Sequence, residues 1–324
     1  MIDDDTLSRQ LGSTLDKTTL NISNATKYEG KVRDNYVLNG KRIIVVTDRV
    51  SAFDVVLTTI PFKGQVLNQM AGFWFDKTRK ISKNHVLDVP DPNVTVATEC
   101  TQIPVEFVVR GYITGVTSTS IWTHYSKGSR EFCGHPLPDG LRKDQKLEAP
   151  LVTPSTKAEK GGHDESISRD EVIRRGLLTP EDFDEISEKA LKLYSAGVKH
   201  SAKNGVILVD TKYEFGKNPE GEIVLIDEVH TPDSSRFWFS DSYEELFAKG
   251  AEQRKIDKEF VRKWLADKGF KGDGPVPVIP AEVRVETAKR YIQAFELITG
   301  EEFTAVPGNP EQRIRESLAG KGYL

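Results

Sequence analysis

The sequence predicts an α+β fold, with strands gathered in the first third of the chain and helices in the last quarter. Apolar, β-branched runs that stop at Pro, Gly or Asp are typical of strands. Three such runs occur early, at residues 41–47, 55–60 and 105–110. Helical periodicity with glycine near the ends marks the C-terminal part, where we expect helices at 243–251, 258–268, 280–299 and 310–318.

The central part of the chain adds both kinds of element. A short helix is expected around residues 67–80. The stretch 126–162 is rich in Gly, Pro and charge, so we interpret it as loops or a mobile flap. Ser168 followed by Glu171 is a capping box, which predicts a short helix directly after it.

A longer helix and a hairpin follow. Thr179 before Pro180 is a strong helix start, and the helix should run to about residue 203, where Gly205 stops it. Strands are expected at 206–215 and 222–229, joined by Lys217-Asn218-Pro219-Glu220-Gly221. The turn residues of that connection predict an antiparallel hairpin.

Composition and charge narrow the class of protein. Hydrophobic residues make up 37% and charged residues 29% of the 324 residues, which is typical of a globular protein with a sizeable core. The net charge of -4 argues against a general nucleic-acid binder, which would carry a basic excess. A pocket for anionic small molecules stays compatible with this charge if a few Lys and Arg residues converge.

The cysteines and the hydropathy pattern indicate the compartment. Cys100 and Cys133 form no CxxC pair, which favours a reduced, intracellular protein. The chain begins with acidic residues in place of the basic start of a signal peptide, and no apolar run reaches the length of a membrane span. We therefore expect a cytoplasmic protein without a membrane or nucleic-acid partner. The six histidines lack metal-ligand spacing, which excludes zinc.

The segment Leu208-Val209-Asp210-Thr211-Lys212-Tyr213-Glu214-Phe215-Gly216 carries the strongest chemical pattern. Alternation along a strand places Asp210, Lys212 and Glu214 on one face and the residues between them on the other, mostly in a core. A solvated sheet face is an equal alternative for the segment alone. The partner strand is apolar until Asp227, which in the simplest register lies near Asp210. Clustered carboxylates with a lysine suit a Mg²⁺-nucleotide site.

Other segments carry weaker signals. Gly30-Lys31-Val32-Arg33 suits a loop that covers phosphates, and a turn with solvated charges is the alternative, since no Walker A spacing occurs. Thr153 to Asp164 suits a loop approaching a ligand, or a surface loop. Arg236 could bind a phosphate or form a structural ion pair. Arg262 lies near the start of a predicted helix, where anions are favoured, but alone is ordinary.

Together these segments resemble the phosphoribosylaminoimidazole-succinocarboxamide synthases, or SAICAR synthetases. The stretches LVDTKYEFG and DEVHTPDSSRFW are highly specific, and the matches follow the family's order over most of the chain. The C-terminal helical part is similar to that of the fungal and related bacterial enzymes. The matching stretches are Gly30–Asp34, Ser51–Asp54, Pro61–Gly64, Glu106–Gly115, Thr153–Asp164, Val209–Gly216, Asp227–Trp238 and Asp257–Leu265.

The resemblance implies a fold and a reaction. The fold is an ATP-grasp-like α+β architecture, for which we expect a nucleotide-binding β lobe at 1–115, a central α+β lobe at 116–255 and a helical segment at 256–324. The reaction condenses a carboxylated aminoimidazole ribotide with L-aspartate. ATP is consumed and Mg²⁺ is required. Phosphoryl transfer would turn the unreactive carboxylate into an acyl phosphate, which the aspartate amine attacks.

The resemblance also implies residue roles. The catalytic residues are Lys212 and Asp210, and the metal ligands are Glu214 and Asp227. ATP contacts are implied for Lys31, Val32, Arg33, Lys157 and Asp227. The substrate-binding residues are Arg110, Asp210, Lys212, Arg236 and Arg262 for the ribotide, and Gly162, His163 and Asp164 for aspartate.

One position departs from the family pattern. Val116 stands where the family usually has a serine that contacts the ribotide, and an apolar side chain cannot donate that hydrogen bond. Thr117 or Ser118 substitutes, or the contact is missing, and we expect weaker ribotide binding. The competing functions are a small-molecule kinase that uses Mg-ATP and a nucleotide-binding regulatory module. The oligomeric state is expected to be a monomer or a homodimer.

Overall fold

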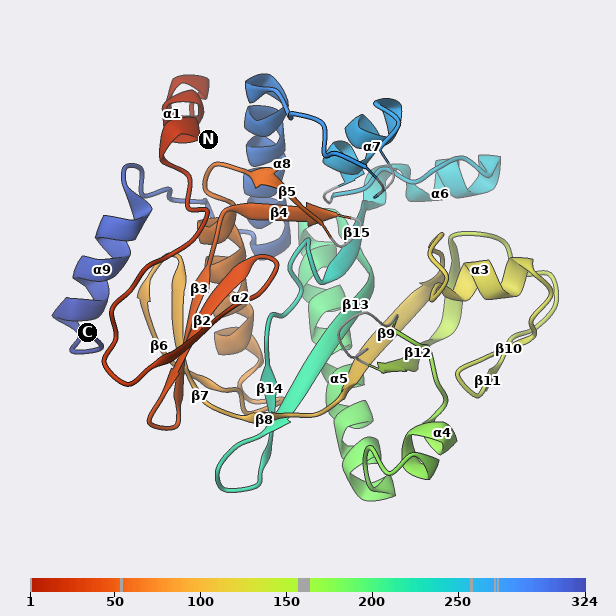
Figure 1. Cartoon of the computed structure of the whole chain (residues 1–324). Coiled ribbons are helices and arrows are strands. Elements are labelled where there is room, and N and C mark those ends of the chain that lie inside the picture. Colours follow the sequence, from red (N-terminus) through yellow and green to blue (C-terminus); the bar gives the residue numbers. More distant parts are fainter. Residues whose placement is uncertain (1, 53–54, 157–163, 257–258, 271, 273) are drawn as a thin grey trace.

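A computed structural model describes residues 2–52, 55–156, 164–256, 259–270, 272 and 274–324. Among these residues, the N-terminal part forms a five-stranded antiparallel sheet in the order β1-β2-β3-β7-β6 (Figure 1). The β-branched residues of the central strand β3 are buried, which explains why the run predicted at 41–47 forms a strand. The strands are β1 (Thr26–Glu29), β2 (Arg33–Leu38), β3 (Lys41–Val46), β6 (Val86–Asp91) and β7 (Val94–Thr98).

A second sheet forms the middle of the molecule. Its order is β12-β9-β13-β14, with β15 and β8 also paired to β13. The strands are β8 (Thr101–Gln102), β9 (Val105–Ile113), β12 (Gln145–Thr156), β13 (Val206–Lys217), β14 (Ile223–Ile226) and β15 (Ser235–Phe239). Two small antiparallel pairs flank the sheets: β4 (Arg49–Ala52) with β5 (Val55–Thr59), and β10 (Glu131–Phe132) with β11 (His135–Pro136).

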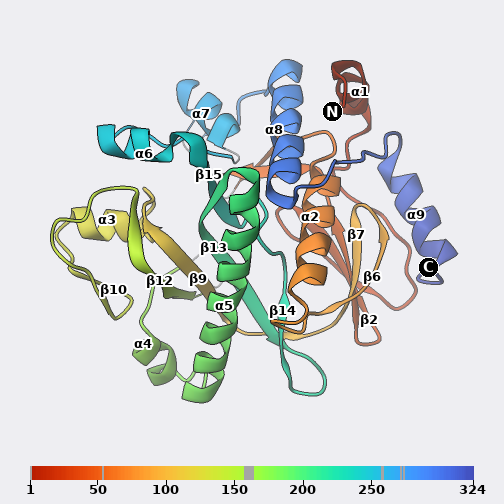
Figure 2. The ribbon, with the colours of Figure 1, turned by 180° about the vertical axis from the view of Figure 1, so that it is seen from behind.

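Three long helices cover the sheets from behind, as Figure 2 shows. They are α2 (Lys63–Thr78), α5 (Pro180–Ser201) and α8 (Ala281–Thr299). The main hydrophobic core joins residues of both sheets to these helices, so the two sheets share one core. The shorter helices are α1 (Asp4–Gln10), α3 (Ile121–Ser126), α4 (Arg169–Arg174), α6 (Ser240–Lys249), α7 (Glu259–Asp267) and α9 (Pro310–Gly320), with 3-10 turns at Leu11–Ser13 and Ala202–Asn204.

The helix starts predicted from capping residues are confirmed. The side chain of Ser168 accepts a hydrogen bond from the backbone of Glu171, and that of Thr179 accepts one from Asp182. Gly205 adopts the left-handed conformation just after α5 and its 3-10 extension. The hairpin of β13 and β14 and the four C-terminal helices are also confirmed, whereas α1 was not anticipated.

Two predicted segments are corrected. The helix expected at 67–80 begins at Lys63, because Phe62 turns the chain with a φ of 61° and the backbone of Gly64 donates to buried Asp48. The stretch 126–162 is not all loop, since it contains β10, β11 and the whole of β12. Pro154 lies in β12, at the edge of its sheet, where a strand tolerates a missing N–H group.

The α+β class predicted from the sequence is confirmed, with antiparallel sheets and covering helices. The division at residue 115 stays a prediction. Strands β8 and β9, which precede it, pair with β13 in the second sheet. The C-terminal helix α8 packs against α2 from the N-terminal part. Within the described ranges, no helix is long and apolar enough to span a membrane.

Candidate active site

Strand β13 carries the site because it lies between β9 and β15. Its register places Asp210 directly between Arg110 of β9 and Arg236 of β15. Arg236 Nε lies 3.1 Å from one carboxylate oxygen of Asp210, and Arg110 Nη1 lies 3.5 Å from the other. Arg110 and Asp210 are buried. Burial lowers the pKa of Arg110, and the charge of Arg236 lowers it further while Asp210 raises it.

A bulge in β13 sets which side chains face the site. Leu208 pairs with Phe237 and Asp210 with Arg236, so Val209 is an extra residue on β13. Leu208 therefore packs in the main core with Tyr213, whereas Val209 packs in a separate cluster. The expected alternation holds for Asp210, Lys212 and Glu214, and Val209 is buried in a core as expected, although its cluster is separate from that of Tyr213.

Lys212 is the cation at the centre of an acidic cluster. Its Nζ lies 3.1 Å from Glu106 and 3.7 Å from Asp227, and it forms a close ion pair with Glu214. Burial opposes the charge of Lys212, but the three carboxylates outweigh it and raise the pKa of Lys212 well above its ordinary value. The lysine therefore stays protonated and acts through its charge and its hydrogen bonds.

The predicted proximity of Asp227 to Asp210 is wrong. In the hairpin, Glu214 pairs with Ile226, and β14 ends there. Asp227 then adopts a φ of 69°, and the chain leaves β13 before it returns as β15. Asp227 consequently lies beside Lys212 and Arg33, and Arg236 takes the position next to Asp210.

Arg33 links the N-terminal sheet to this cluster. Its guanidinium pairs closely with Asp227 and lies 2.8 Å from Glu228. Burial opposes its charge, but the two carboxylates raise the pKa of Arg33 above its ordinary value. Burial also raises the pKa of Glu228, against the opposing charge of Arg33. The glycine-containing segment before β2 is thereby held against the second sheet.

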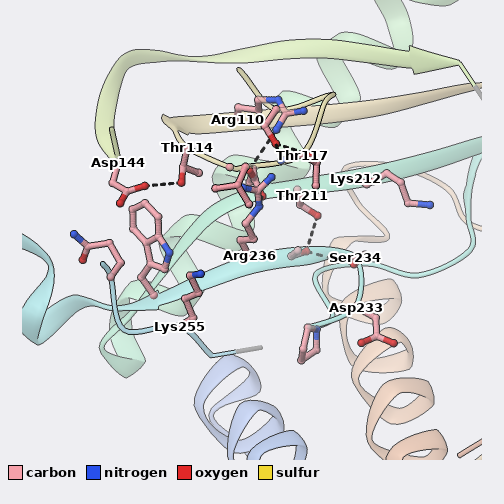
Figure 3. A pocket seen from close by; sticks show the side chains of 18 of the residues that line it. Arg110, Thr114, Thr117, Asp144, Thr211, Lys212, Asp233, Ser234, Arg236 and Lys255 are labelled. Atoms are coloured by element: carbon pink, nitrogen blue, oxygen red, sulfur yellow. Dashed lines mark hydrogen bonds and ion pairs between the residues drawn. The ribbon is translucent and has the colours of Figure 1, made fainter. Parts of the chain in front are cut away.

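Two cavities open on either side of the Lys212 cluster. The first, which we call the arginine cavity, has a volume of about 890 Å³ and is partly shown in Figure 3. The second, which we call the glycine-segment cavity, has a volume of about 470 Å³. The two cavities meet at this cluster. Lys212 lines the arginine cavity, and its partners Glu214 and Asp227 line the glycine-segment cavity.

The arginine cavity is basic, although the chain carries a net negative charge. Its described lining contains seven Lys or Arg residues and four Asp or Glu residues, so it suits anionic reactants. The cations come from separate elements, including α7 and α8. They are Arg110, Lys143, Lys212, Arg236, Lys255, Lys263 and Arg290.

The glycine-segment cavity contains the residues expected to meet a nucleotide. Lys31, Val32 and Arg33 line it opposite Glu214 and Asp227. Apolar and polar side chains complete its described wall, which suits a flat base next to phosphates. These include Ile44, His85, Thr98, Cys100, Gln102 and Ile226.

Some predicted site residues cannot be placed. Lys157, Gly162 and His163 lie outside the described residues, as does the side chain of Arg262, which belongs to α7. Asp164 is described and lies close enough to the cluster for its charge to contribute to the raised pKa of Glu106. The main cause of that raised pKa is burial, which Lys212 opposes.

The sequence reasoning missed several residues that the structure brings to the site. Glu106 contacts Lys212, and Gln102 donates a close hydrogen bond to Glu214. Ser120 was also missed, and it lines the arginine cavity together with Thr117, one of the two residues considered as substitutes at Val116. A signal existed for Glu106, which lies four positions before Arg110 in an otherwise apolar strand, so both charges share one face. The short strand β8, which carries Gln102, gave no comparable signal.

The fold and these cavities define an enzyme that uses a nucleotide to act on a second, anionic reactant. Comparison with known proteins identifies which one: the sequence model of SAICAR synthetase matches residues 26–277, and the chain belongs to this family. It is an ATP-dependent carbon–nitrogen ligase of purine biosynthesis, EC 6.3.2.6. This finding selects the ligase over the small-molecule kinase and the regulatory module.

Similar proteins cover nearly the whole chain. The phosphoribosylaminoimidazole-succinocarboxamide synthase of Legionella pneumophila strain Paris is 52% identical over 296 residues, which are 90% of this chain and 94% of that protein. The Bacteroides thetaiotaomicron synthase is 50% identical over 94% of this chain and 97% of its own. Both matches therefore extend over nine-tenths or more of this chain.

Solved structures agree with this assignment. The Saccharomyces cerevisiae SAICAR synthase complexed with SAICAR has a TM-score of 0.78 and 34% identity, and the match covers 90% of this chain and all of the yeast chain. A SAICAR synthetase in complex with ADP has a TM-score of 0.65 and 26% identity over 86% of this chain and all of its own.

Proposed function

We propose that the chain joins 5-amino-1-(5-phospho-D-ribosyl)imidazole-4-carboxylate to L-aspartate through an acyl phosphate. The observation that carries this proposal is the position of Lys212 between the two cavities, beside Glu214 and Asp227. A carboxylate held in the arginine cavity near Lys212 would lie next to the terminal phosphate of a nucleotide in the other cavity. One charged group then serves both reactants at the point where they meet.

In the first step, a carboxylate oxygen of the ribotide attacks the terminal phosphorus of ATP. A new P–O bond forms, the bond to ADP breaks, and ADP leaves with the electron pair. Lys31, Val32, Arg33 and Lys157 bind the nucleotide in this proposal, where cations and backbone N–H groups offset the phosphate charge. Lys212 neutralises the carboxylate, so that two anions can approach each other.

In the second step, the neutral amine of aspartate attacks the acyl carbon. The C–N bond forms, the C–O bond to phosphate breaks, and the amine loses a proton. Gly162, His163 and Asp164 help to bind aspartate in this proposal. The ribotide is bound by Arg110, Asp210, Lys212, Arg236 and Arg262.

Glu214 and Asp227 would hold Mg²⁺. Both carboxylates line the glycine-segment cavity, and Mg²⁺ is usually bound by one or two carboxylates together with phosphate oxygens. The described residues contain no group of three His, Cys, Asp or Glu side chains suited to a metal, so a site made of protein alone is not expected there. When bound with the nucleotide, Mg²⁺ neutralises phosphate charge. We also propose that the fold is ATP-grasp-like, as the resemblance to the family implies.

The compartment and the assembly remain proposals from the sequence. We propose a cytoplasmic enzyme because Cys100 and Cys133 are both unpaired thiols, as is usual in a reducing compartment. We propose that it works as a monomer or a homodimer.

Isotope transfer tests the proposed mechanism. The purified protein is given ATP, Mg²⁺, aspartate and ribotide labelled with ¹⁸O in its carboxylate, and each reactant is omitted in turn. We expect the released phosphate to carry one ¹⁸O atom and product formation to require all reactants. Phosphate without the label would rule out the acyl phosphate, and turnover without aspartate to a phosphorylated product would point to a kinase.

A further inference from the structure

The turn from Thr114 to Ser120 packs against Arg110 and Arg236, two of the arginines that line the arginine cavity. Gly115 has a φ of 98°, and a Cβ atom there would lie 2.6 Å from Arg236 Nη1 and 2.4 Å from Ser120 Oγ. The turn therefore packs directly on Arg236, and only glycine fits at this point. Arg110 fixes the other end of the turn by donating a hydrogen bond of 3.2 Å to the carbonyl of Thr119.

Two hydroxyl groups of this turn form a short relay. The backbone N–H of Thr117 donates to Ser120 Oγ at 3.1 Å, and Ser120 Oγ lies 2.7 Å from Thr117 Oγ1. Each hydroxyl has one proton to donate. If Ser120 donates to Thr117, then Thr117 can donate its own proton to a ligand. Among the described residues, Thr117 Oγ1 otherwise lies only 3.4 Å from Thr119 Oγ1, a long contact that a ligand can replace.

The structure distinguishes Thr117 from its neighbours. Thr117 and Ser120 both line the arginine cavity together with Arg110 and Arg236, and Figure 3 labels Thr117 and the two arginines in this cavity. Val116 lies on the same wall but has no polar side-chain atom. Ser118 does not belong to the described lining, and its carbonyl accepts a hydrogen bond from His124.

We propose that Thr117, backed by Ser120, donates a hydrogen bond to the phosphate of the ribotide beside Arg110 and Arg236. This inference rests on the proposed function. The ribotide carboxylate belongs near Lys212, where the two cavities meet, so its phosphate monoester at the far end of the molecule reaches the arginine wall. The guanidinium groups of Arg110 and Arg236 share the single carboxylate of Asp210, so a net positive charge remains to bind the phosphate.

A hydroxyl contact adds direction to this charged site. The guanidinium groups supply donors in one plane each, whereas a phosphate has oxygens pointing in several directions. Thr117 lies on the turn that packs against the arginines, so its hydroxyl can donate to a phosphate oxygen that neither guanidinium group contacts. Thr117 is thus a binding residue that discriminates the phosphorylated sugar from the free nucleoside.

A cycle of two variants and two ligands tests this assignment. The ligands are the ribotide, measured by calorimetry, and the same nucleoside without its phosphate, measured by competition. Thr117→Val keeps the shape of the side chain and removes the hydroxyl. We expect it to weaken ribotide binding about ten-fold, as for a hydrogen bond to a charged group, and to leave nucleoside binding unchanged.

The control is Ser118→Ala, which removes a hydroxyl from the same turn outside the described cavity lining and should change neither affinity. Binding of ADP reports that each variant is folded. Unchanged ribotide affinity in Thr117→Val would overturn the inference, and so would an equal loss for both ligands, which would show a structural role. If the wild-type protein binds ADP but not the ribotide, the proposed function itself is wrong, an outcome that needs no variant to detect.

Discussion

The ammonium nitrogen of Lys212 lies 3.7 Å from a carboxylate oxygen of Asp227, at the boundary between two cavities. Glu106 and Glu214 contact the same nitrogen, so one cation offsets three carboxylates from two strands and a connecting turn. This charge balance decides what can enter. Without the lysine, Arg33 would still pair with Asp227, but the negative charges of Glu106 and Glu214 would repel both the terminal phosphate and the ribotide carboxylate.

Replacing Lys212 by alanine should abolish synthesis while the fold stays intact. The change removes a charge from the meeting point of two anions and little core packing. Loss of one positioned electrostatic group lowers kcat by about 10²–10³-fold in other enzymes, and we expect at least that loss here. Steady-state product formation measures the effect, and thermal unfolding checks the fold.

A lysine on the same strand supplies the control for that variant. Lys217 pairs with Asp182 at 2.7 Å and is more exposed than Lys212. Lys217→Ala should therefore keep nearly normal turnover. If Lys212→Ala also kept it, Lys212 would not have its assigned role.

Replacing Asp227 by asparagine should separate nucleotide binding from ribotide binding. Asparagine tolerates the φ of 69° at this position, so the backbone should be retained. The change removes a negative charge opposite Lys31 and Arg33 in the glycine-segment cavity. We expect Mg-ADP affinity to fall about ten-fold or more, a loss of about 1.4 kcal/mol or more, while ribotide affinity changes much less.

Calorimetry with each ligand measures this difference. Asp182→Asn serves as the control, because it removes a carboxylate from the start of α5, which does not line either cavity in the described residues. Equal losses of affinity for Mg-ADP and ribotide in Asp227→Asn would contradict the division of roles.

The elements that local chemistry specifies were predictable from the sequence. Thr179 and Ser168 mark helix starts through their own side chains, and the turn after Lys217 specifies a hairpin. Strand β12 was not predictable in this way. Its pairing with β9 is a long-range contact, and its position at the sheet edge permits the prolines that made the sequence resemble a loop.

The site was predictable only where one strand determined it. Alternation placed Asp210, Lys212 and Glu214 on one face. The partners of these residues depended on register, which periodicity does not specify, so Asp227 was expected beside Asp210 where the structure places Arg236. The bulge at Val209 similarly follows from the pairing of β13 with β15 and has no sequence marker of its own.

The stability of the protein should depend on pH through His85. Burial, with a smaller contribution from the charges of Arg33 and Arg42, lowers the pKa of His85 to about 4, although Asp227 opposes this shift. In the unfolded chain the imidazole of His85 becomes protonated near pH 6.5, whereas in the folded chain it becomes protonated only near pH 4. The contribution of neutral His85 to the free energy of unfolding is therefore complete above pH 6.5 and is lost as the pH falls toward 4. This contribution amounts to about 3 kcal/mol.

His85→Gln removes this proton without removing all hydrogen-bonding capacity. Urea unfolding between pH 7.5 and 4 should show a smaller loss of unfolding free energy in the variant than in the wild type. His230, whose pKa burial lowers to about 3, remains in both proteins, so the difference between the two curves isolates His85. Parallel curves would show that His85 does not titrate as described.

Replacing Val116 by serine should strengthen ribotide binding. Val116 is 81% exposed at the arginine cavity, next to Thr117, and it has no donor to offer a phosphate. A serine there adds one donor to those of Thr117 and the arginines. Because the position is exposed, the gain should be small, about three-fold in affinity for a hydrogen bond worth about 0.7 kcal/mol.

The matched control is Val278→Ser, since Val278 is 91% exposed and does not line the arginine cavity among the described residues. That variant should bind the ribotide like the wild type. The comparison uses the apparent affinity in calorimetric titrations of all three proteins. A Val116→Ser protein with no gain over Val278→Ser would show that the ribotide does not pass within hydrogen-bonding distance of this position, and the phosphate would then have to be placed elsewhere on the arginine wall.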